Sequence, residues 1–336
     1  MPRTTEGEVG GVDAPLAVID SDEARAVRSE VLSGLSQTEK WISSKYHYDE
    51  RGSELFEEIT RLEEYYPTRT ERGLLARWMP KWVAELRPST LIELGAGNAE
   101  KSRIILDAMV ETGSGETYVP VDVSSDFLRE TARRLESEYP SLEIEPEVAD
   151  IVGPLEVRAG LPGPAWIAFL GSTLGNFEPH RAIELLGRIA GELGSGDLLL
   201  LGVDLRPGPN KPVERVELAY NDAQGVTAEF SLNVLSVINR EAGSDFNLEA
   251  FRHRSHYNAE KGRIETYLES LREQTVRFPG ADTVHIGKGE RIRTEISSKY
   301  DRPTIDHLFE RAGLTVERWI EDDEGLYALV LGAAAE

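Results

Sequence analysis

Short apolar runs alternate with amphipathic stretches in the middle of the chain, after Pro88. Five runs predict buried strands, at residues 90–94, 116–121, 143–148, 165–170 and 197–203. Between them, apolar residues recur at helical spacing and predict helices over residues 101–110, 126–138 and 179–193. Alternating strands and helices are typical of a mostly parallel sheet covered by helices, so we expect an α/β fold.

The C-terminal part of the chain adds strands of a different kind. A helix is predicted over residues 303–312 and strands over residues 314–320 and 326–331, with a turn sequence at residues 322–325. Such a turn favours an antiparallel hairpin. Because a dehydrogenase sheet usually ends in a sixth parallel strand, this pattern predicts a Rossmann-like class I methyltransferase sheet with a terminal antiparallel hairpin.

The segments on either side of this region do not alternate strands and helices in the same way. Their pattern predicts a smaller α+β substrate-binding domain. A first helix is expected to begin at Ser21 or Asp22. Its apolar stripe consists of Ala24, Val27, Val31, Leu32 and Leu35. Further helices are predicted over residues 53–59, 68–86 and 226–238, and residues 263–277 are strand-like.

Two tyrosines precede the helix predicted over residues 68–86. Pro67 biases Tyr66 away from the helical conformation, so we expect Tyr65 and Tyr66 on a turn.

These patterns divide the chain into domains. Residues 1–20 are rich in Gly, Glu and Thr without a period, which predicts a flexible tail. We expect residues 70–205 and 301–336 to form the methyltransferase domain. Residues 21–69 and 206–300 would form the substrate-binding domain, with the substrate in the seam.

Composition and charge narrow the chemistry. The 336 residues include 60 Asp and Glu against 37 Lys and Arg, and the net charge of −23 disfavours nucleic acid as a partner. The absence of cysteine from the sequence excludes disulfides and thiolate chemistry. No apolar run approaches the ~20 residues of a membrane span, and a signal peptide is not recognisable. We therefore expect a cytoplasmic protein that acts on a small molecule without a membrane partner, and we take it to be a monomer.

A glycine turn and two acids predict the cofactor site. Gly95 and Gly97 follow the first strand and open a helix, where a Cβ would keep a ligand from the backbone. The third glycine of the dinucleotide fingerprint is absent, and Glu100 stands where a pyrophosphate needs a small residue, which favours a sulfonium over NAD. Asp122 and Asp150 end the next two strands, where they could bind a ribose and an adenine amino group. Together these residues predict S-adenosylmethionine (SAM) as the cofactor.

The histidines and serines give weaker indications of a functional site. His253 and His256 would share one face of a helix, but arginines interleave with them and no carboxylate is close, so we expect no metal. Ser124 and Ser172 lack the Gly-x-Ser-x-Gly pattern, which makes an acyl-transfer hydrolase a poor alternative.

Four clusters of aromatic and polar residues stand out: residues 45–56 (KYHYDERGSELF), 65–71 (YYPTRTE), 169–177 (FLGSTLGNF) and 293–300 (RTEISSKY). In this order they resemble those of the histidine Nα-methyltransferases of ergothioneine biosynthesis, and the resemblance extends over residues 25–333. It implies transfer of three methyl groups from SAM to the α-amino nitrogen of L-histidine, which gives the trimethylbetaine hercynine.

The resemblance also implies residue roles on the cofactor side. Gly95, Gly97 and Lys101 match the cofactor loop, Asp122 the ribose acid and Asp150 the acid near adenine. Two positions depart from the family pattern. The turn has Gly97-Asn98-Ala99 where small hydroxyl residues are more common, and Ile151 stands where an aromatic residue often stacks near adenine.

On the substrate side, the resemblance implies a complete set of contacts. Asn176 and Tyr220 match the pair that holds the substrate carboxylate, and Gly171 lies in the third cluster. Tyr48 and Tyr65 match the catalytic tyrosines around the amino group and the imidazole. Glu295 and Ser297 match the pair that hydrogen-bonds the ring.

The chemistry of these residue types agrees with the implied reaction. In-line attack on a methyl sulfonium needs a neutral amine held close to the methyl carbon. Tyrosine faces can stabilise a methylated ammonium by cation–π attraction. A ligand without ring nitrogens would leave Glu295 and Ser297 unpaired, which is a strong basis for selectivity.

Alternatives remain at this stage. A related enzyme could methylate another aromatic amino acid such as tryptophan, whose indole has one donor and no acceptor. A non-catalytic SAM sensor could use the second module to bind a protein. From the residues alone, the tyrosines could equally be aromatics of a domain seam and Glu295 a solvated strand residue.

Overall fold

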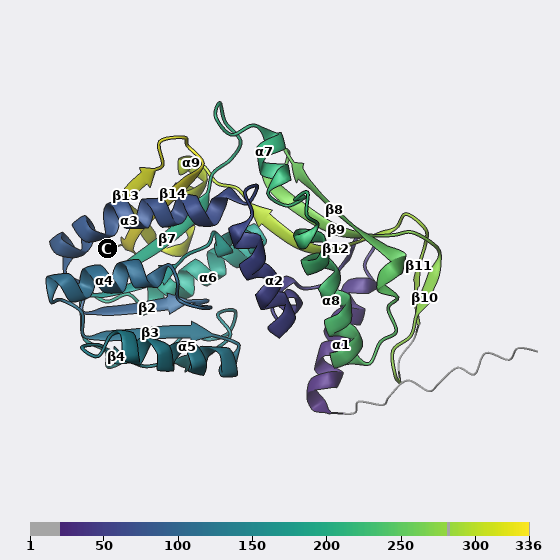
Figure 1. Ribbon diagram of the computed structural model, residues 1–336, viewed down its shortest axis with the longest axis horizontal. Helices are drawn as coiled ribbons and strands as arrows, with labels where there is room; N and C mark the ends of the chain where they lie inside the picture. The colour runs from purple at the N-terminus through teal and green to yellow at the C-terminus, as the bar shows by residue number, and fades with distance from the viewer. Residues whose placement is uncertain (1–20, 281–282, 336) are drawn as a thin grey trace, which may run out of the picture.

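The computed structural model describes residues 21–280 and 283–335, which form two lobes that lie side by side (Figure 1). One lobe is built on an eight-stranded sheet and the other on a four-stranded sheet. The predicted flexible tail, residues 1–20, lies outside the described residues. Among the described residues, no helix has both the length and the apolar character that crossing a membrane requires.

The larger sheet has the strand order β13-β14-β7-β6-β2-β3-β4, and β5 also pairs with β3. Neighbouring strands from β4 to β7 are parallel, whereas β14 is antiparallel to both β7 and β13. The strands are β2 (Thr90–Leu94), β3 (Thr117–Asp122), β4 (Glu143–Ile144), β5 (Glu147–Val148), β6 (Ala165–Phe169), β7 (Leu198–Asp204), β13 (Leu314–Glu321) and β14 (Tyr327–Ala334). This topology confirms the predicted methyltransferase sheet with its terminal antiparallel hairpin.

Helices cover both faces of this sheet because its strands are apolar on both sides. Leu91 and Ile92 are neighbours in β2, yet they pack into different cores because successive side chains of a strand point to opposite faces. The helices on one face are α6 (Pro179–Glu192) and α9 (Arg302–Ala312), and those on the other are α3 (Tyr66–Leu86), α4 (Ser102–Thr112) and α5 (Ser125–Glu138). The carboxyl ends of β2 and β3 point toward the second lobe (Figure 1).

The smaller sheet has the order β1-β12-β9-β8, antiparallel except for the pair β1 and β12. The strands of this lobe are β1 (Lys40–Trp41), β8 (Phe251–Asn258), β9 (Arg263–Ser270) and β12 (Arg291–Ser298), with a separate pair β10 (Gln274–Val276) and β11 (Val284–Ile286). Its helices are α1 (Asp22–Leu35), η1 (Ser44–His47), α2 (Glu50–Arg61), α7 (Val213–Leu218), α8 (Val226–Ala242) and η3 (Leu248–Ala250). The predicted first helix is confirmed, since the Ser21 side chain caps α1 by accepting from the N–H of Ala24 (3.1 Å).

The segments that connect the lobes lie next to each other. The N–H of Arg206 donates to the carbonyl of Tyr300 (2.7 Å), and the N–H of Tyr300 donates to the carbonyl of Asp204 (2.9 Å). The outgoing segment after β7 and the returning segment after β12 are therefore hydrogen-bonded side by side. A further connection enters the larger lobe at Tyr66, the first residue of α3.

Two strand predictions need correction. The run at residues 143–148 is broken into β4 and β5 because Pro146 lies between them and has no N–H for the ladder. The strand-like stretch at residues 263–277 is interrupted after Ser270, and its last part belongs to the separate pair of β10 and β11.

The expected turn at the two tyrosines is also wrong. Tyr65 is the N-terminal cap of α3, and Tyr66 is already helical. Pro67 occupies the first turn of the helix, where a missing N–H costs nothing. Both tyrosines are consequently buried, at 8% and 0% exposure.

His253 and His256 lie on strand β8 and not on a helix. Residues three apart in a strand point to opposite faces, so the two imidazoles are separated. The ring nitrogens of His253 are hydrogen-bonded to Ser231 Oγ (2.9 Å) and to the carbonyl oxygen of Tyr220 (2.8 Å), whereas His256 stacks on Tyr267. His253 thus supports the segment that carries Tyr220.

Candidate active site

The glycine turn after β2 presents its backbone to open space. Gly95 and Gly97 have φ angles of +73° and +54°, and nothing lies within 4 Å of a Cβ placed on either residue. The N–H of Gly97 donates to Asp122 Oδ2 (3.0 Å), while Asp122 Oδ1 accepts from the N–H of Ser124 (3.1 Å). The structure therefore joins the predicted cofactor loop to the predicted ribose acid.

Asp150 lies at the rim of the same sheet edge. Val148 pairs with Asp122, which places Asp150 two residues beyond the end of this short ladder. The carboxylate of Asp150 is exposed and accepts from the N–H of Val152 (2.9 Å). Ile151 is half-buried against the core of the larger sheet. The contacts of both residues with an adenine remain predictions.

Glu71, which the sequence analysis did not assign, connects the cofactor loop to the third cluster. It is fully buried, and its Oε2 pairs with Lys101 Nζ (2.6 Å). The N–H of Gly171 donates to both carboxylate oxygens (2.9 and 3.0 Å), and the Tyr327 hydroxyl donates to Oε1 (2.8 Å). A Cβ on Gly202 would lie 1.9 Å from Oε1, so this glycine of β7 makes room for the carboxylate. Glu71 thereby fixes Lys101 relative to Gly171.

Four aromatic rings form a chain of edge-to-face contacts where the lobes meet. Ring centroids are 5.8 Å apart for Tyr48 and Phe56, 6.3 Å for Phe56 and Tyr65, and 6.2 Å for Tyr65 and Tyr220. Tyr65 and Tyr220 are buried, whereas Tyr48 is 37% exposed. Burial of the hydroxyl groups raises the pKa of all three tyrosines, and the charge of Glu295 adds to the shift. All three hydroxyls therefore stay protonated near neutral pH.

Glu295 and Ser297 lie two residues apart on β12, next to this aromatic chain. Ser297 Oγ accepts from the Tyr220 hydroxyl (2.8 Å). Within the described ranges, the Glu295 carboxyl has no hydrogen-bond partner, and burial raises its pKa to about 7 against the opposing effect of Lys299. The residue is half-buried, and a carboxyl that is partly removed from water and has no partner is available to bind a ligand. Glu295 is therefore the clearest sign of a ligand site.

Asn176 ends the short helix η2 (Thr173–Asn176), which packs directly on β12. A Cβ on Gly175 would lie 2.8 Å from the carbonyl oxygen of Ser298, so only glycine permits this close approach. The helix thus brings Asn176 to the strand that carries Glu295 and Ser297. Its contact with a substrate carboxylate remains a prediction.

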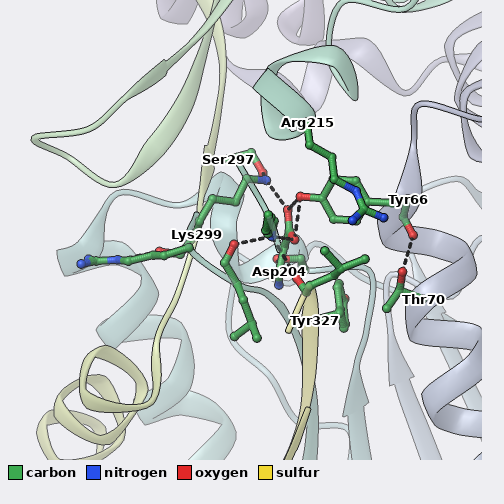
Figure 2. Close-up of polar contacts among 12 residues, drawn as sticks. Tyr66, Thr70, Asp204, Arg215, Ser297, Lys299 and Tyr327 are labelled. Carbon is green, nitrogen blue, oxygen red and sulfur yellow. Dashed lines mark hydrogen bonds and ion pairs between the residues drawn. The ribbon is translucent and has the colours of Figure 1, made fainter. Parts of the chain in front are cut away.

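A second buried carboxylate, Asp204, lies close to Ser297 and Lys299 (Figure 2). It pairs with Lys299 (2.8 Å) and Lys211, and it accepts from the Tyr66 hydroxyl at 3.0 Å to each oxygen. Burial favours the neutral acid, but the two lysines outweigh it and hold the pKa of Asp204 below its ordinary value. Burial lowers the pKa of Lys211 to about 8. Asp204 is consequently a fixed negative charge between two cations.

Comparison with known proteins identifies the family of this chain. Residues 27–334 match the model of a family described as histidine-specific methyltransferase, SAM-dependent. The chain belongs to this family.

The amino-acid sequence is also similar to those of individual members of this family. The chain is 41% identical over 310 residues to the histidine N-alpha-methyltransferase of Mycobacterium tuberculosis and 40% identical over 312 residues to that of Mycolicibacterium smegmatis. Each alignment covers 92% of this chain and 95% of the relative. It is also 33% identical over 294 residues to ergothioneine biosynthesis protein 1 of Neurospora crassa, which covers 84% of this chain and 32% of that protein.

The site fits the cofactor of the histidine-specific methyltransferases. The open backbone at Gly95 and Gly97 can be approached closely by a ligand, and Asp122 supplies a carboxylate beside it. Glu100 pairs with Arg72 at the surface (2.7 Å) and is not turned into the loop. The case for SAM over NAD therefore rests on the family and not on Glu100.

Two buried acids of this methyltransferase, Glu71 and Asp204, were not predicted, although the sequence contains an indication of each. Glu71 lies one helical turn from Leu74 and Leu75, so a charge interrupts the buried face of α3. Asp204 is the last residue of strand β7, as Asp122 is of strand β3. Neither signal indicates the lysines that pair with these acids.

For the described residues, no group of three or more His, Cys, Asp or Glu side chains could hold a metal ion.

Proposed function

We propose that this protein transfers three methyl groups in succession from SAM to the α-amino nitrogen of L-histidine and releases hercynine, a step of ergothioneine biosynthesis. The names of its relatives support this substrate. The observation that carries the proposal is the half-buried Glu295 carboxyl, which has no hydrogen-bond partner among the described residues, beside the buried Ser297 hydroxyl on the same strand. Neutral imidazole has one N–H donor and one acceptor nitrogen, which complement this pair.

The substrate carboxylate is assigned to Asn176 and Tyr220. The Asn176 amide carries two N–H donors, and the ammonium of Lys299 lies 2.8 Å from the Tyr220 hydroxyl, where its charge favours an anion. Gly171 lies between this end and the cofactor loop, since a Cβ on it would be 3.2 Å from Lys101 Nζ. A glycine here lets the substrate approach the cofactor side.

Tyr48 and Tyr65 are assigned to the amino group as the catalytic residues. SAM supplies a methyl carbon activated by its positively charged sulfur. The neutral amine is the reactive form, and because α-amines titrate within a few units of neutral pH, a deprotonated fraction can be captured without a strong base. The tyrosine hydroxyls orient the amine, and their ring faces stabilise the methylated ammonium by cation–π attraction.

On the cofactor side, Gly95, Gly97, Lys101 and Asp122 are assigned to the amino acid and ribose parts of SAM. Asp150 and Ile151 are assigned to the adenine. In this proposal residues 70–205 and 301–336 bind the cofactor, while residues 21–69 and 206–300 bind the substrate. Because one chain supplies every residue, we propose a monomer that acts in the cytoplasm. Light scattering of the purified protein tests the monomer.

Mass spectrometry of the purified protein with SAM and the twenty amino acids tests the reaction. We expect mass gains of one, two and three methyl groups on histidine alone. Methylation of tryptophan in preference to histidine would contradict the substrate. Tight SAM binding without transfer to any amino acid would indicate a sensor.

A matched variant tests the ring contact. Glu295→Ala should raise the KM for histidine by a factor of about 10 or more, because a charge-assisted hydrogen bond is lost, while the Kd for SAM stays within about twofold. An unchanged KM for histidine would contradict the role of Glu295.

A further inference from the structure

Lys299 is a fully buried lysine directly behind the residues assigned to the substrate ring. An ammonium group has three N–H donors and no acceptor. All three donors of Lys299 have partners at 2.8 Å: Asp204 Oδ2, the Tyr220 hydroxyl and Ser297 Oγ. Figure 2 shows Lys299 close to Ser297 and Asp204. Each proton of this lysine therefore has a fixed direction.

The arrangement also determines where the hydroxyl proton of Ser297 can go. Ser297 Oγ accepts from Lys299 and from Tyr220, which together occupy both of its lone pairs. Its own proton cannot bind to Lys299, which has no acceptor. No other acceptor for this proton is present among the residues that the structure describes. Because Ser297 is only 4% exposed, its hydroxyl needs an acceptor from a ligand.

We propose that Lys299 is a specificity-determining positioning residue, which makes Ser297 a hydrogen-bond donor toward the substrate. Lys299 occupies one acceptor lone pair of Ser297 Oγ directly, and it also donates to the Tyr220 hydroxyl, whose single proton occupies the other lone pair. The inference rests on the proposed function and extends it. Ser297 then selects a ring nitrogen with a free lone pair, Glu295 binds the ring N–H, and neutral imidazole satisfies both groups.

A ring that has an N–H but lacks an acceptor nitrogen would leave the Ser297 proton buried and unpaired. Pyrrole and indole are such rings. Sites built to hydrogen-bond a substrate group discriminate strongly against analogues that lack it. Lys299 would thereby exclude amino acids that resemble histidine in size but not in hydrogen bonding.

Lys211 provides a matched control for Lys299. Both lysines are buried and both pair with Asp204. The remaining hydrogen-bond partners of Lys211 are the backbone carbonyl oxygens of Leu205 and Leu326, and among the described residues Lys211 makes no hydrogen bond to Tyr220 or Ser297. Loss of Lys211 removes a similar charge from the same carboxylate without changing the donors that face the substrate.

The test is a competition between histidine and 3-(pyrrolyl)alanine, whose ring has the same size and an N–H but no acceptor nitrogen. With both present at equal concentration, the ratio of methylated products gives the ratio of their kcat/KM values. We expect Lys299→Met and Lys299→Gln to lower the preference for histidine by about tenfold or more, which corresponds to one hydrogen bond. The glutamine variant should do so because its carbonyl can accept the Ser297 proton.

Two further measurements separate this role from a structural one. Lys211→Met should leave the preference within about twofold of the wild-type value even if it lowers stability. In a Ser297→Ala background, Lys299→Met should no longer change the preference, because the lysine acts through that hydroxyl. The Kd for SAM verifies that each variant is folded.

The outcomes are distinguishable. An unchanged preference in folded Lys299→Met and Lys299→Gln, or an equal loss in Lys211→Met, would overturn the inference and leave histidine methylation standing. If the wild-type protein does not methylate histidine, the proposed function fails and the inference fails with it.

Discussion

The two ends of the candidate site are built in different ways. The cofactor end consists of a backbone turn and an acid at the ends of adjacent strands in one sheet, joined by the bond from the N–H of Gly97 to Asp122. The substrate end consists of side chains from remote segments, such as Tyr220 and Ser297, which are 77 residues apart. A backbone site is specified by a local motif, whereas a side-chain site depends on how distant segments pack.

Each end has its own buried carboxylate, and the two differ in how they are neutralised. Glu71 pairs with one lysine, Lys101, whose side chain is 23% exposed. Asp204 pairs with two lysines, Lys211 and Lys299, that are completely buried. Breaking a buried pair leaves an uncompensated charge, so the substrate end should be the more sensitive of the two.

The largest effect is expected for Asp204→Asn. This change leaves two buried ammonium groups without their counter-charge and should lower the free energy of unfolding by about 3–5 kcal/mol. Urea denaturation followed by circular dichroism measures it. Asp323→Asn removes an exposed pair with Arg77 and should cost no more than about 1 kcal/mol. Equal effects of the two substitutions would contradict the importance of the buried network.

A smaller effect is expected for Glu71→Gln. The amide oxygen can still accept from Gly171, but Lys101 loses its charge partner near solvent, so we expect a loss of about 2 kcal/mol in the free energy of unfolding. The Kd for SAM, measured by calorimetry, should rise more than the KM for histidine. A larger loss of stability than in Asp204→Asn would reverse the comparison between the two carboxylates.

Next comes Asp122→Asn, which tests whether the cofactor end is separable from the substrate end. Loss of the carboxylate charge should raise the Kd for SAM about tenfold, since hydrogen bonds to charged groups contribute roughly 1.5–3 kcal/mol. The preference for histidine over other amino acids should not change. Asp126→Asn, at an exposed position in α5, serves as the control. A change of substrate preference in Asp122→Asn would show that the two ends are coupled.

The smallest effect concerns Glu295 and pH. Its pKa of about 7 in the folded protein lies above the ordinary 4.5, so the folded state binds this proton more tightly than the unfolded state. The contribution to stability is present at low pH and is lost as the pH rises from about 4.5 through about 7. Glu295→Gln cannot ionise, so its melting temperature relative to wild type should be higher at about pH 8 than at about pH 5.

Thermal denaturation at both pH values measures this difference. Glu249→Gln, at an exposed carboxylate, should show no such change between the two pH values. The same offset from wild type at both values in Glu295→Gln would contradict the raised pKa.

The larger sheet was predictable from the sequence because its strands are buried on both faces. Residues 165–170 are an uninterrupted apolar run, and residues 90–94 contain a single charged residue, Glu93, so these patterns are hard to mistake for a loop. Strand β8 was missed for the opposite reason. Arg252 and Arg254 pair with Glu269 of the neighbouring strand β9, so ion pairs between strands make the segment look too polar for a sheet.

The two ends of the candidate site differ in how much of each could be predicted from the sequence. Gly95, Gly97 and Asp122 were predicted from spacing, because they belong to one strand–turn–helix unit and its neighbour. Glu295 and Ser297 were predicted through resemblance to a family. The contact of Lys299 with Tyr220 joins residues 79 positions apart in the smaller lobe, and no local pattern contains it.

The connections between the lobes pass through the site itself. Tyr65 and Tyr66 enter one lobe, Asp204 ends the strand that leaves it, and Lys299 lies on the segment that returns. The elements that connect the two sheets are therefore next to the residues proposed to hold the substrate. Any opening of the molecule must shift the residues around the ligand, and a ligand seated there must in turn limit how far the molecule can open.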